Sequence, residues 1–197
     1  MDNNTTPKIS LIVPFYWMKN WQFFLVRCLE SIAKQSFTDY EVILTKAGSM
    51  PVNTNRAMQC AKGEIIKVLF MDDWLDSAYY LDDIVRAFSN SEVEWLITST
   101  DNNRVPMWTD DLEKGNNRLG SPSALAFRNH QDNLLFDEKL SWLLDCDFYK
   151  RMEKRFGKPT ILRGVNVGIG IHEGQATNLM TMEQKFAEHE YLKKKYA

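Results

Sequence analysis

Residues 65–73 read Ile-Ile-Lys-Val-Leu-Phe-Met-Asp-Asp, so a short apolar run ends in two carboxylates. A run of this length and composition is typical of a strand that is buried on both faces of a sheet. Asp72 and Asp73 follow the strand at its carboxyl end, where open α/β sheets bind their ligands. Adjacent carboxylates repel each other unless a positive charge, such as a divalent cation, neutralises them. Taken alone, however, the pair fits better with Asp73 as the N-cap of a following helical turn.

The residues around this strand alternate between strand-like and helix-like patterns. Apolar runs at 9–13 and 40–44 precede it, and helical spacing of apolar residues is found at 21–33 and 53–61. Alternation of this kind predicts a parallel sheet built with right-handed crossovers. The later expected elements are a helix at 81–88, strands at 95–100 and 123–128, a helix at 142–156, a weakly alternating segment at 160–171 and a closing helix at 181–197. The sequence therefore predicts an α/β fold in which helices flank a central, mostly parallel sheet.

The composition is that of an ordinary folded protein. The chain has 197 residues, of which 44% are hydrophobic and 25% are charged, and its formal net charge is -2. These values suit one α/β domain over residues 1–197, with a frayed start at 1–7. The nearly balanced charge argues against nucleic acid as a partner, because binding to nucleic acid by counterion release needs a basic face.

The cysteines and the hydropathy pattern indicate in which cellular compartment the protein is expected. Cys28, Cys60 and Cys146 form no Cys-x-x-Cys pair, which excludes zinc-finger and thioredoxin-like sites. Residues 1–7 lack the layout of a signal peptide, and no apolar run approaches the roughly 18 residues needed to cross a bilayer. We therefore expect reduced thiols, a cytoplasmic location and no transmembrane segment. The lysines at 193–195 could make a weak peripheral contact with anionic lipid, although a solvated helix end is favoured because such clusters usually have about four to eight basic residues.

Several stretches occur together in an order that is characteristic of one enzyme family. They are Lys-Ile-Ser-Leu-Ile-Val-Pro-Phe-Tyr at 8–16, Arg-Cys-Leu-Glu-Ser-Ile at 27–32, Gln-Ser-Phe at 35–37, Tyr-Glu-Val-Ile-Leu at 40–44, Asn-Arg-Ala at 55–57, Ala-Lys-Gly-Glu-Ile-Ile at 61–66 and Phe-Met-Asp-Asp at 70–73. From about residue 9 to about residue 177, the chain resembles the inverting family-two glycosyltransferases of the GT-A fold. The resemblance implies a Rossmann-like nucleotide-diphospho-sugar transferase fold. It also implies transfer of a sugar from a nucleotide-diphosphate donor to a hydroxyl group of a glycan or lipid-linked acceptor.

The same resemblance implies a metal-binding Asp-x-Asp motif after the third strand. Phe70 stands at the first acidic position of this motif, so only Asp72 is kept, and Asp73 follows it as a helper or a cap. With fewer protein carboxylates, more of the ion's coordination shell is left to diphosphate and water, which suits Mg²⁺ or Mn²⁺. His172 corresponds to the C-terminal metal or diphosphate contact of GT-A enzymes, although an isolated histidine is more often an ordinary surface or core residue.

Further positions are assigned to the donor by the resemblance. Besides the two aspartates, the expected nucleotide-sugar-binding residues are Pro14, Phe15, Tyr16, Lys46, Asn55, Arg56, Gly120 and Ser121. The aromatic side chains of Phe15 and Tyr16 could stack on a base or simply cover the core. Lys46 stands where the family often has an acid that meets the base, so it could face a phosphate or be merely solvated. Gly120 and Ser121 match the loop that borders the donor sugar, but Gly and Ser-Pro are also common in turns.

Asp145 matches the family's general base, and Asp147 matches a supporting residue. Both are expected near the N-terminus of a helix, which favours a charged carboxylate and leaves a simple capping role open. Trp108, in a long polar loop at 101–120, and Trp142 are expected on the acceptor side. The sequence thus predicts a metal-dependent inverting glycosyltransferase. The alternative is a non-catalytic nucleotide-sugar or glycan-binding domain with a degenerate metal motif; a phosphoryl-transfer enzyme is disfavoured because no basic Gly-rich loop follows the first strand.

Overall fold

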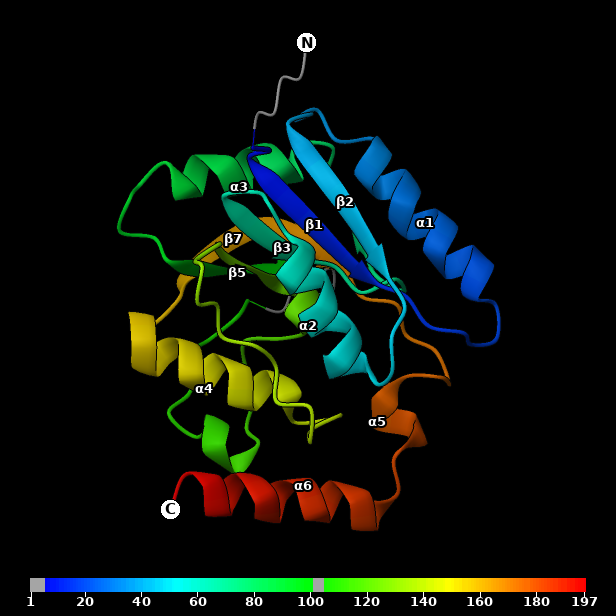
Figure 1. Ribbon diagram of the computed structural model, residues 1–197, viewed down its shortest axis with the longest axis vertical. Helices are drawn as coiled ribbons and strands as arrows, with labels where there is room; N and C mark the ends of the chain where they lie inside the picture. Colours follow the sequence, from blue (N-terminus) through cyan, green and yellow to red (C-terminus); the bar gives the residue numbers. More distant parts are fainter. Residues whose placement is uncertain (1–5, 101–104) are drawn as a thin grey trace.

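The computed structural model describes residues 6–100 and 105–197, and a seven-stranded sheet lies at its centre (Figure 1). The strand order is β2-β1-β3-β6-β5-β7-β4. The strands are β1 (Ile9–Pro14), β2 (Tyr40–Thr45), β3 (Ile65–Val68), β4 (Trp74–Leu75), β5 (Trp95–Thr100), β6 (Leu125–Arg128) and β7 (Thr160–Gly168). Only β6 and β4 run against the other strands. The prediction of a mostly parallel α/β sheet is confirmed.

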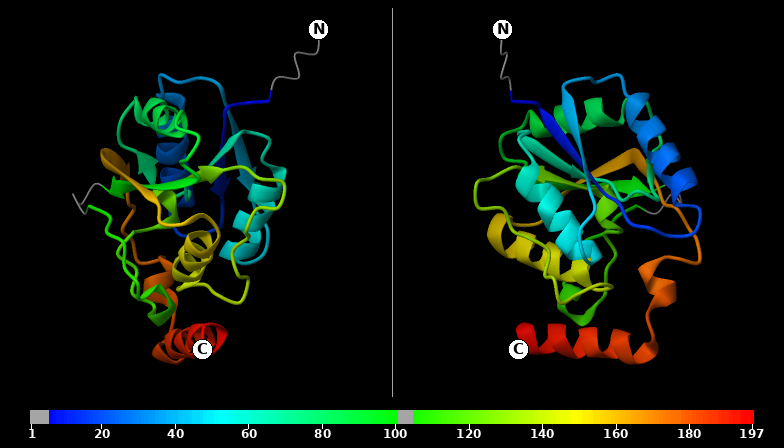
Figure 2. Two further views of the ribbon diagram at one scale, coloured as in Figure 1. Left: turned by 90° about the vertical axis from the view of Figure 1, so that its left-hand side faces the viewer. Right: turned by 45° about the vertical axis from the view of Figure 1, so that its right-hand side comes forward.

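Helices cover both faces of this sheet (Figure 2). They are α1 (Trp21–Ala33), α2 (Met50–Cys60), α3 (Tyr80–Phe88), α4 (Leu144–Phe156), α5 (Ala176–Leu179) and α6 (Met182–Lys195). Side chains of β1 alternate between the faces, because successive residues of a strand point in opposite directions. Leu11 and Val13 pack in the cluster that contains residues of α1 and α3, whereas Ile12 packs in the cluster that contains residues of α2 and α4.

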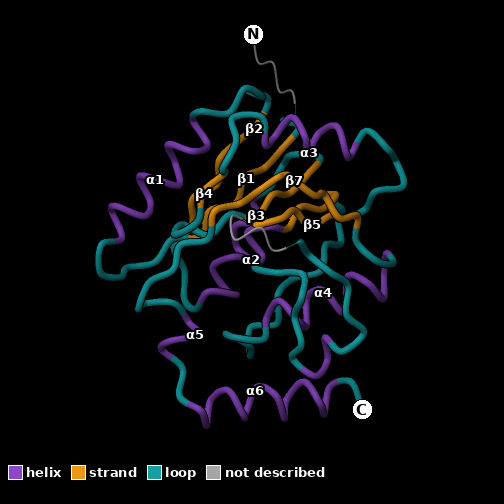
Figure 3. The backbone as a smooth tube through the Cα atoms, turned by 180° about the vertical axis from the view of Figure 1, so that it is seen from behind, coloured by secondary structure: helices purple, strands orange, loops and turns teal. Residues whose placement is uncertain are grey.

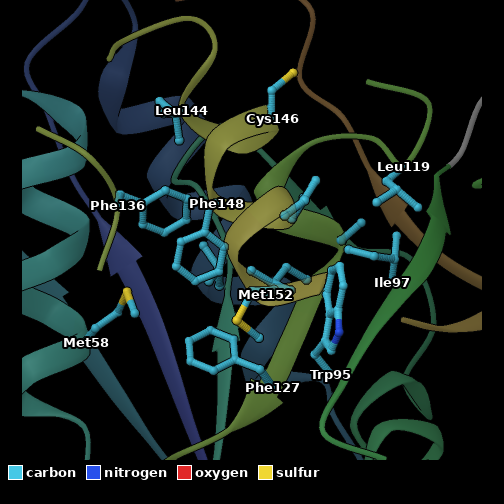
Figure 4. Packing of buried hydrophobic residues seen from close by; sticks show 14 of the residues in the cluster. Met58, Trp95, Ile97, Leu119, Phe127, Phe136, Leu144, Cys146, Phe148 and Met152 are labelled. Carbon is cyan, nitrogen blue, oxygen red and sulfur yellow. The ribbon is translucent and has the colours of Figure 1, made fainter. Parts of the chain in front are cut away.

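The core beneath α4 is rich in aromatic rings (Figure 4). Phe148 stacks on Phe136, with ring centroids 4.2 Å apart, and Trp95 lies 5.9 Å from Tyr149. Each ring removes a large apolar surface from water, which stabilises the fold by about 1.5–3 kcal/mol for a fully buried side chain. This packing fixes α4, the helix that carries Asp145, against the sheet.

Several expected boundaries are corrected by the structure. The strand expected at 65–71 ends at Val68, and Asp73 precedes the short strand β4 rather than a helical turn, so its expected role as a helix cap is wrong. The helix expected at 53–61 already begins at Met50, because Pro51 fits the first turn of a helix, where no backbone donor is needed. Residues 1–5 of the expected frayed start and residues 101–104 of the long loop lie outside the described residues.

The closing helix, α6, lies at the end of the molecule opposite the start of β1, with α4 between it and the sheet (Figures 1 and 3). It starts with a capping box in which Thr181 and Gln184 bond reciprocally. Within residues 6–100 and 105–197, no helix has the length and apolar character that crossing a membrane requires.

Candidate active site

Asp72 and His172 meet although they are 100 positions apart in the sequence. Asp72 lies beyond the carboxyl end of β3, and His172 lies beyond the end of β7, so the two strands bring them to one edge of the sheet. Nε2 of His172 is 2.8 Å from Oδ2 of Asp72, and both side chains are about nine-tenths buried. Two ligands at right angles on one Mg²⁺ ion, each about 2.1 Å from it, are about 3 Å apart. This pair is the candidate for holding a cation, while within residues 6–100 and 105–197 no group of three or more His, Cys, Asp or Glu side chains is arranged to bind a metal.

Asp73 is fixed beside this pair by the end of β7. Its Oδ1 accepts a hydrogen bond from the backbone N–H of Gly170 at 2.8 Å. A Cβ atom at position 170 would lie only 2.1 Å from the main-chain oxygen of Asp72, so this close approach of two chain segments requires glycine. Burial, followed by the charge of Asp72, raises the pKa of Asp73. Neutralising Asp72 with a cation would relieve part of this effect.

Lys67 is a fully buried lysine in β3, and no pattern in the sequence marks it as a site residue. Its Nζ donates hydrogen bonds to the carbonyl oxygens of Val68, Ser123 and Leu125. Burial lowers the pKa of Lys67 to about 7, while the negative charge of Asp73 acts in the opposite direction. The lysine thus provides an internal basic group whose charge interacts with that of Asp73, which follows its own strand.

Asp72, Asp73 and Asp145 all line one cavity of about 190 Å³. Expected site residues form much of its wall: Tyr16, Asp72, Asp73, Ser121, Trp142 and Asp145. Pro122, Ser141 and Leu144 also line it. The structure therefore brings the candidate metal ligand and the candidate base to one shared space.

Asp145 lies in the first turn of α4 and is held by two hydrogen bonds. Its Oδ1 accepts from the backbone N–H of Cys146 at 2.7 Å, and its Oδ2 accepts from Nδ2 of Asn117 at 2.6 Å. Burial raises the pKa of Asp145 to about 6, although both hydrogen bonds favour the ionised form. A carboxyl group with this pKa is ionised at neutral pH yet can accept a proton, as a general base must.

Asn117 was not anticipated, because one Asn in a polar loop carries no pattern. Its Nδ2 also donates to the carbonyl oxygen of Gly120 at 2.9 Å, and its Oδ1 accepts from the backbone N–H of Gly120 at 3.1 Å. The residue therefore connects the expected donor-sugar loop at 120–121 to Asp145.

A second cavity of about 250 Å³ shares Tyr16 and Met50 with the first. Its other lining residues are Pro14, Gly48, Ser49, Asn53, Gly174 and Leu179. Asn53 is 3% exposed, and its Nδ2 donates to the carbonyl oxygen of Phe15 at 2.9 Å. Its Oδ1 has no hydrogen-bond partner within the described part of the chain. This oxygen is itself buried from solvent, so it is not exposed to the cavity.

Six expected donor or acceptor residues, Asn55 and Gly120 among them, do not line either cavity, and neither does His172. Phe15 packs edge-on against Trp17 and Trp21, as a part of the core cluster. Lys46 lies over the ring of Trp17, with Nζ 4.2 Å from the ring centroid. Arg56 is exposed. Trp108 donates from Nε1 to Asp110 and packs beside the core.

Asn55 and Asp147 have structural partners instead of cavity positions. Both polar atoms of the Asn55 side chain bond to the backbone of Phe136, at 2.7 and 2.9 Å. Asp147 is fully buried and is bound by Arg151, Lys195 and Tyr196. These contacts tie distant segments together, and they leave neither side chain directed at the shared cavity.

No protein-family model matches the sequence, and a search of curated protein sequences finds no match. Solved structures do match. TarS 1-349 from S. aureus in complex with UDP-GlcNAc matches with a TM-score of 0.68 and 19% identity, over 92% of this chain and 64% of that one. Glucosyl-3-phosphoglycerate synthase from Mycobacterium tuberculosis in complex with Mn²⁺, UDP and glucosyl-3-phosphoglycerate matches with a TM-score of 0.61 and 12% identity, over 94% and 77%.

The mannosyltransferase PcManGT from Pyrobaculum calidifontis in complex with GDP-Man and Mn²⁺ gives a TM-score of 0.59 and 15% identity, over 87% of this chain and 59% of that one. The chain spans between 37% and 64% of the length of the TarS chains that it matches. At sequence identities this low, the structural matches establish similarity of fold alone. Together with the sheet order and the helices on both faces, they identify the architecture of this chain as the GT-A fold of glycosyltransferases.

Proposed function

We propose that the protein is a divalent-metal-dependent glycosyltransferase that transfers a sugar from a nucleotide-diphosphate donor to a hydroxyl group, with inversion. One observation carries the proposal: Asp72, which pairs with His172, lines the same cavity as Asp145. A metal ligand and a base around one space are what a single displacement at an anomeric carbon requires.

Asp72 and His172 would hold Mn²⁺ or Mg²⁺ through one carboxylate oxygen and Nε2. The carboxylate oxygen suits both metals, the imidazole nitrogen favours Mn²⁺ over the harder Mg²⁺, and the remaining positions can be taken by diphosphate and water. When bound, such an ion offsets the negative charge that develops on the departing diphosphate.

Asp145 would act on the acceptor. Its carboxylate takes the proton of the acceptor hydroxyl while that oxygen forms a bond to the anomeric carbon and the bond from this carbon to the diphosphate oxygen breaks. The products are the glycoside, the nucleoside diphosphate and a protonated Asp145, which then returns its proton to solvent. The hydrogen bond from Asn117 orients the carboxylate for this step.

The second cavity is the proposed place of the nucleoside. Tyr16 lines both cavities, so a donor with its nucleoside in the second cavity would have its diphosphate and sugar in the first. The TarS and PcManGT structures contain the nucleotide-sugars UDP-GlcNAc and GDP-Man. Trp142 offers an indole ring at the first cavity, on which the sugar of a glycan or lipid-linked acceptor can pack.

The test is the release of nucleoside diphosphate from a panel of UDP- and GDP-sugars with Mn²⁺, with candidate glycans or water as the acceptor. We expect Asp145→Asn to reduce turnover by about 10²–10⁴-fold, the usual contribution of a general base. Asp76→Asn, at an exposed position, is the matched control. NMR of the product's anomeric configuration tests inversion.

Two results would contradict the proposal. Unchanged turnover in Asp145→Asn would show that Asp145 is not the general base. Tight nucleotide binding without turnover of any donor would support the alternative of a non-catalytic binding domain.

A further inference from the structure

Glu188 is a buried carboxylate whose bonds reach the wall of the shared cavity. It lies on α6 and is only 8% exposed. Its Oε1 accepts from the backbone N–H of Ser141 at 2.8 Å, and its Oε2 accepts from those of Trp142 and Leu143, at 2.9 and 2.8 Å. Burying a carboxylate is costly unless hydrogen bonds compensate, and here three donors converge on one group.

The turn that Glu188 binds leads directly into α4. Leu143 is the N-cap residue of α4, and its side chain has no oxygen with which to cap the helix. Glu188 instead supplies a negative charge from another helix, at the end of α4 where the helix dipole favours it. The backbone N–H groups of 141–143 therefore form an anion-binding turn that is filled by a side chain of the same protein.

Neighbouring residues of α6 hold the side chain of Trp142. Nζ of Lys185 lies 5.3 Å from the centroid of the Trp142 ring, and the ring of His189 meets it edge-on at 5.3 Å. Lys185, Glu188 and His189 are spaced by three and four residues, so they share one face of the helix. One face of α6 thus fixes both the backbone and the ring of Trp142.

The residues held in this way belong to the cavity. Ser141, Trp142, Leu144 and Asp145 all line it, whereas Glu188 does not. We infer that Glu188 is a positioning residue that holds the turn at 141–143, so that Trp142 and Asp145 face the reacting groups. The catalytic consequence of this contact rests on the proposed function, but the contact itself does not.

The experiment compares Glu188→Gln and Glu188→Ala with Glu190→Gln, a change of a partly exposed neighbour whose carboxylate only approaches Lys193, at 3.8 Å. Glutamine keeps the size of the side chain but turns an NH₂ group toward backbone donors. Hydrogen exchange followed by mass spectrometry should show that the amides of 141–143 exchange at least about tenfold faster in both Glu188 variants, while the strands of the sheet keep their protection. Glu190→Gln should exchange like the wild type.

Kinetics separate positioning from a general loss of structure. In Glu188→Gln, kcat for donor turnover should fall about tenfold or more, whereas the Kd for UDP or GDP with Mn²⁺ should change less than about twofold. Wild-type exchange at 141–143 in both variants would overturn the inference, and so would an equal loss of turnover and nucleotide affinity. If the wild-type protein binds no nucleoside diphosphate, the proposed function fails, while the exchange measurement still decides whether Glu188 holds the turn.

Discussion

At the scale of single residues, the chemical environment of Asp145 sets its expected behaviour. Burial raises its pKa to about 6, and the hydrogen bonds from Cys146 and Asn117 limit that rise. A general base must be ionised to accept a proton, so turnover should increase with pH and level off above about 6. Initial rates at saturating donor between pH 4.5 and 8.5 check this expectation. A rate that is constant across this range would contradict the assignment.

The same pKa predicts an effect on stability. The folded state binds the proton of Asp145 more tightly than the unfolded state does, because the pKa is raised from 3.8 to about 6. The contribution of this group to the free energy of unfolding is therefore most favourable at low pH, and it falls as the pH rises from about 4 to about 6. Urea unfolding at pH 4.5 and pH 7 should show a decrease of about 1–3 kcal/mol in the wild type relative to Asp145→Asn. An identical pH dependence in both proteins would rule out the raised pKa.

At the scale of elements, the end of β7 closes against the main chain of Asp72. Gly170→Ala would place a methyl group 2.1 Å from the backbone oxygen of Asp72, and backbone cannot move aside as a side chain can. We expect a loss of about 2–4 kcal/mol in the free energy of unfolding, measured by urea denaturation. Gly174→Ala is the comparison, because its added carbon would meet side chains and not backbone: the ring of His172 at 3.2 Å and Sδ of Met18 at 3.8 Å. Equal effects of the two changes would contradict this explanation.

The helices and strands also show which parts of the fold and of the candidate site can be predicted from the sequence. The alternation in β1 and the helical spacing in α1 are local patterns, and the carboxyl ends of parallel strands meet at one edge, so the place of Asp72 follows from the order of the elements. Asp145 was expected only through the family resemblance, because it starts a helix that follows the antiparallel strand β6. Asn55 was assigned to the donor, but it bonds to the backbone of Phe136, 81 positions away. The spacing of nearby residues carries no information on such a partner. The same holds for Glu188, whose three bonds span about 46 positions.

At the scale of the whole molecule, ligand binding should stabilise the fold by mass action. A ligand that binds only the native state, present at about 100 times its Kd, adds about 2.7 kcal/mol to the free energy of unfolding. We expect UDP or GDP with Mn²⁺ to raise the Tm by several degrees, and EDTA to remove most of this shift because it would take away the cation that Asp72 and His172 are proposed to hold. The change in Tm is measured by thermal unfolding with the nucleotide alone, with Mn²⁺ alone and with both together. A rise in Tm with nucleotide that EDTA does not reduce would count against the proposed metal.

The contact between α6 and the turn before α4 has a consequence for protein synthesis. The strands of the sheet and Asp145 all leave the ribosome before residue 188 does. A nascent chain can therefore assemble its central sheet while the turn at 141–143 still lacks the carboxylate that binds it. The cavity wall is completed late in translation, after the scaffold on which it stands.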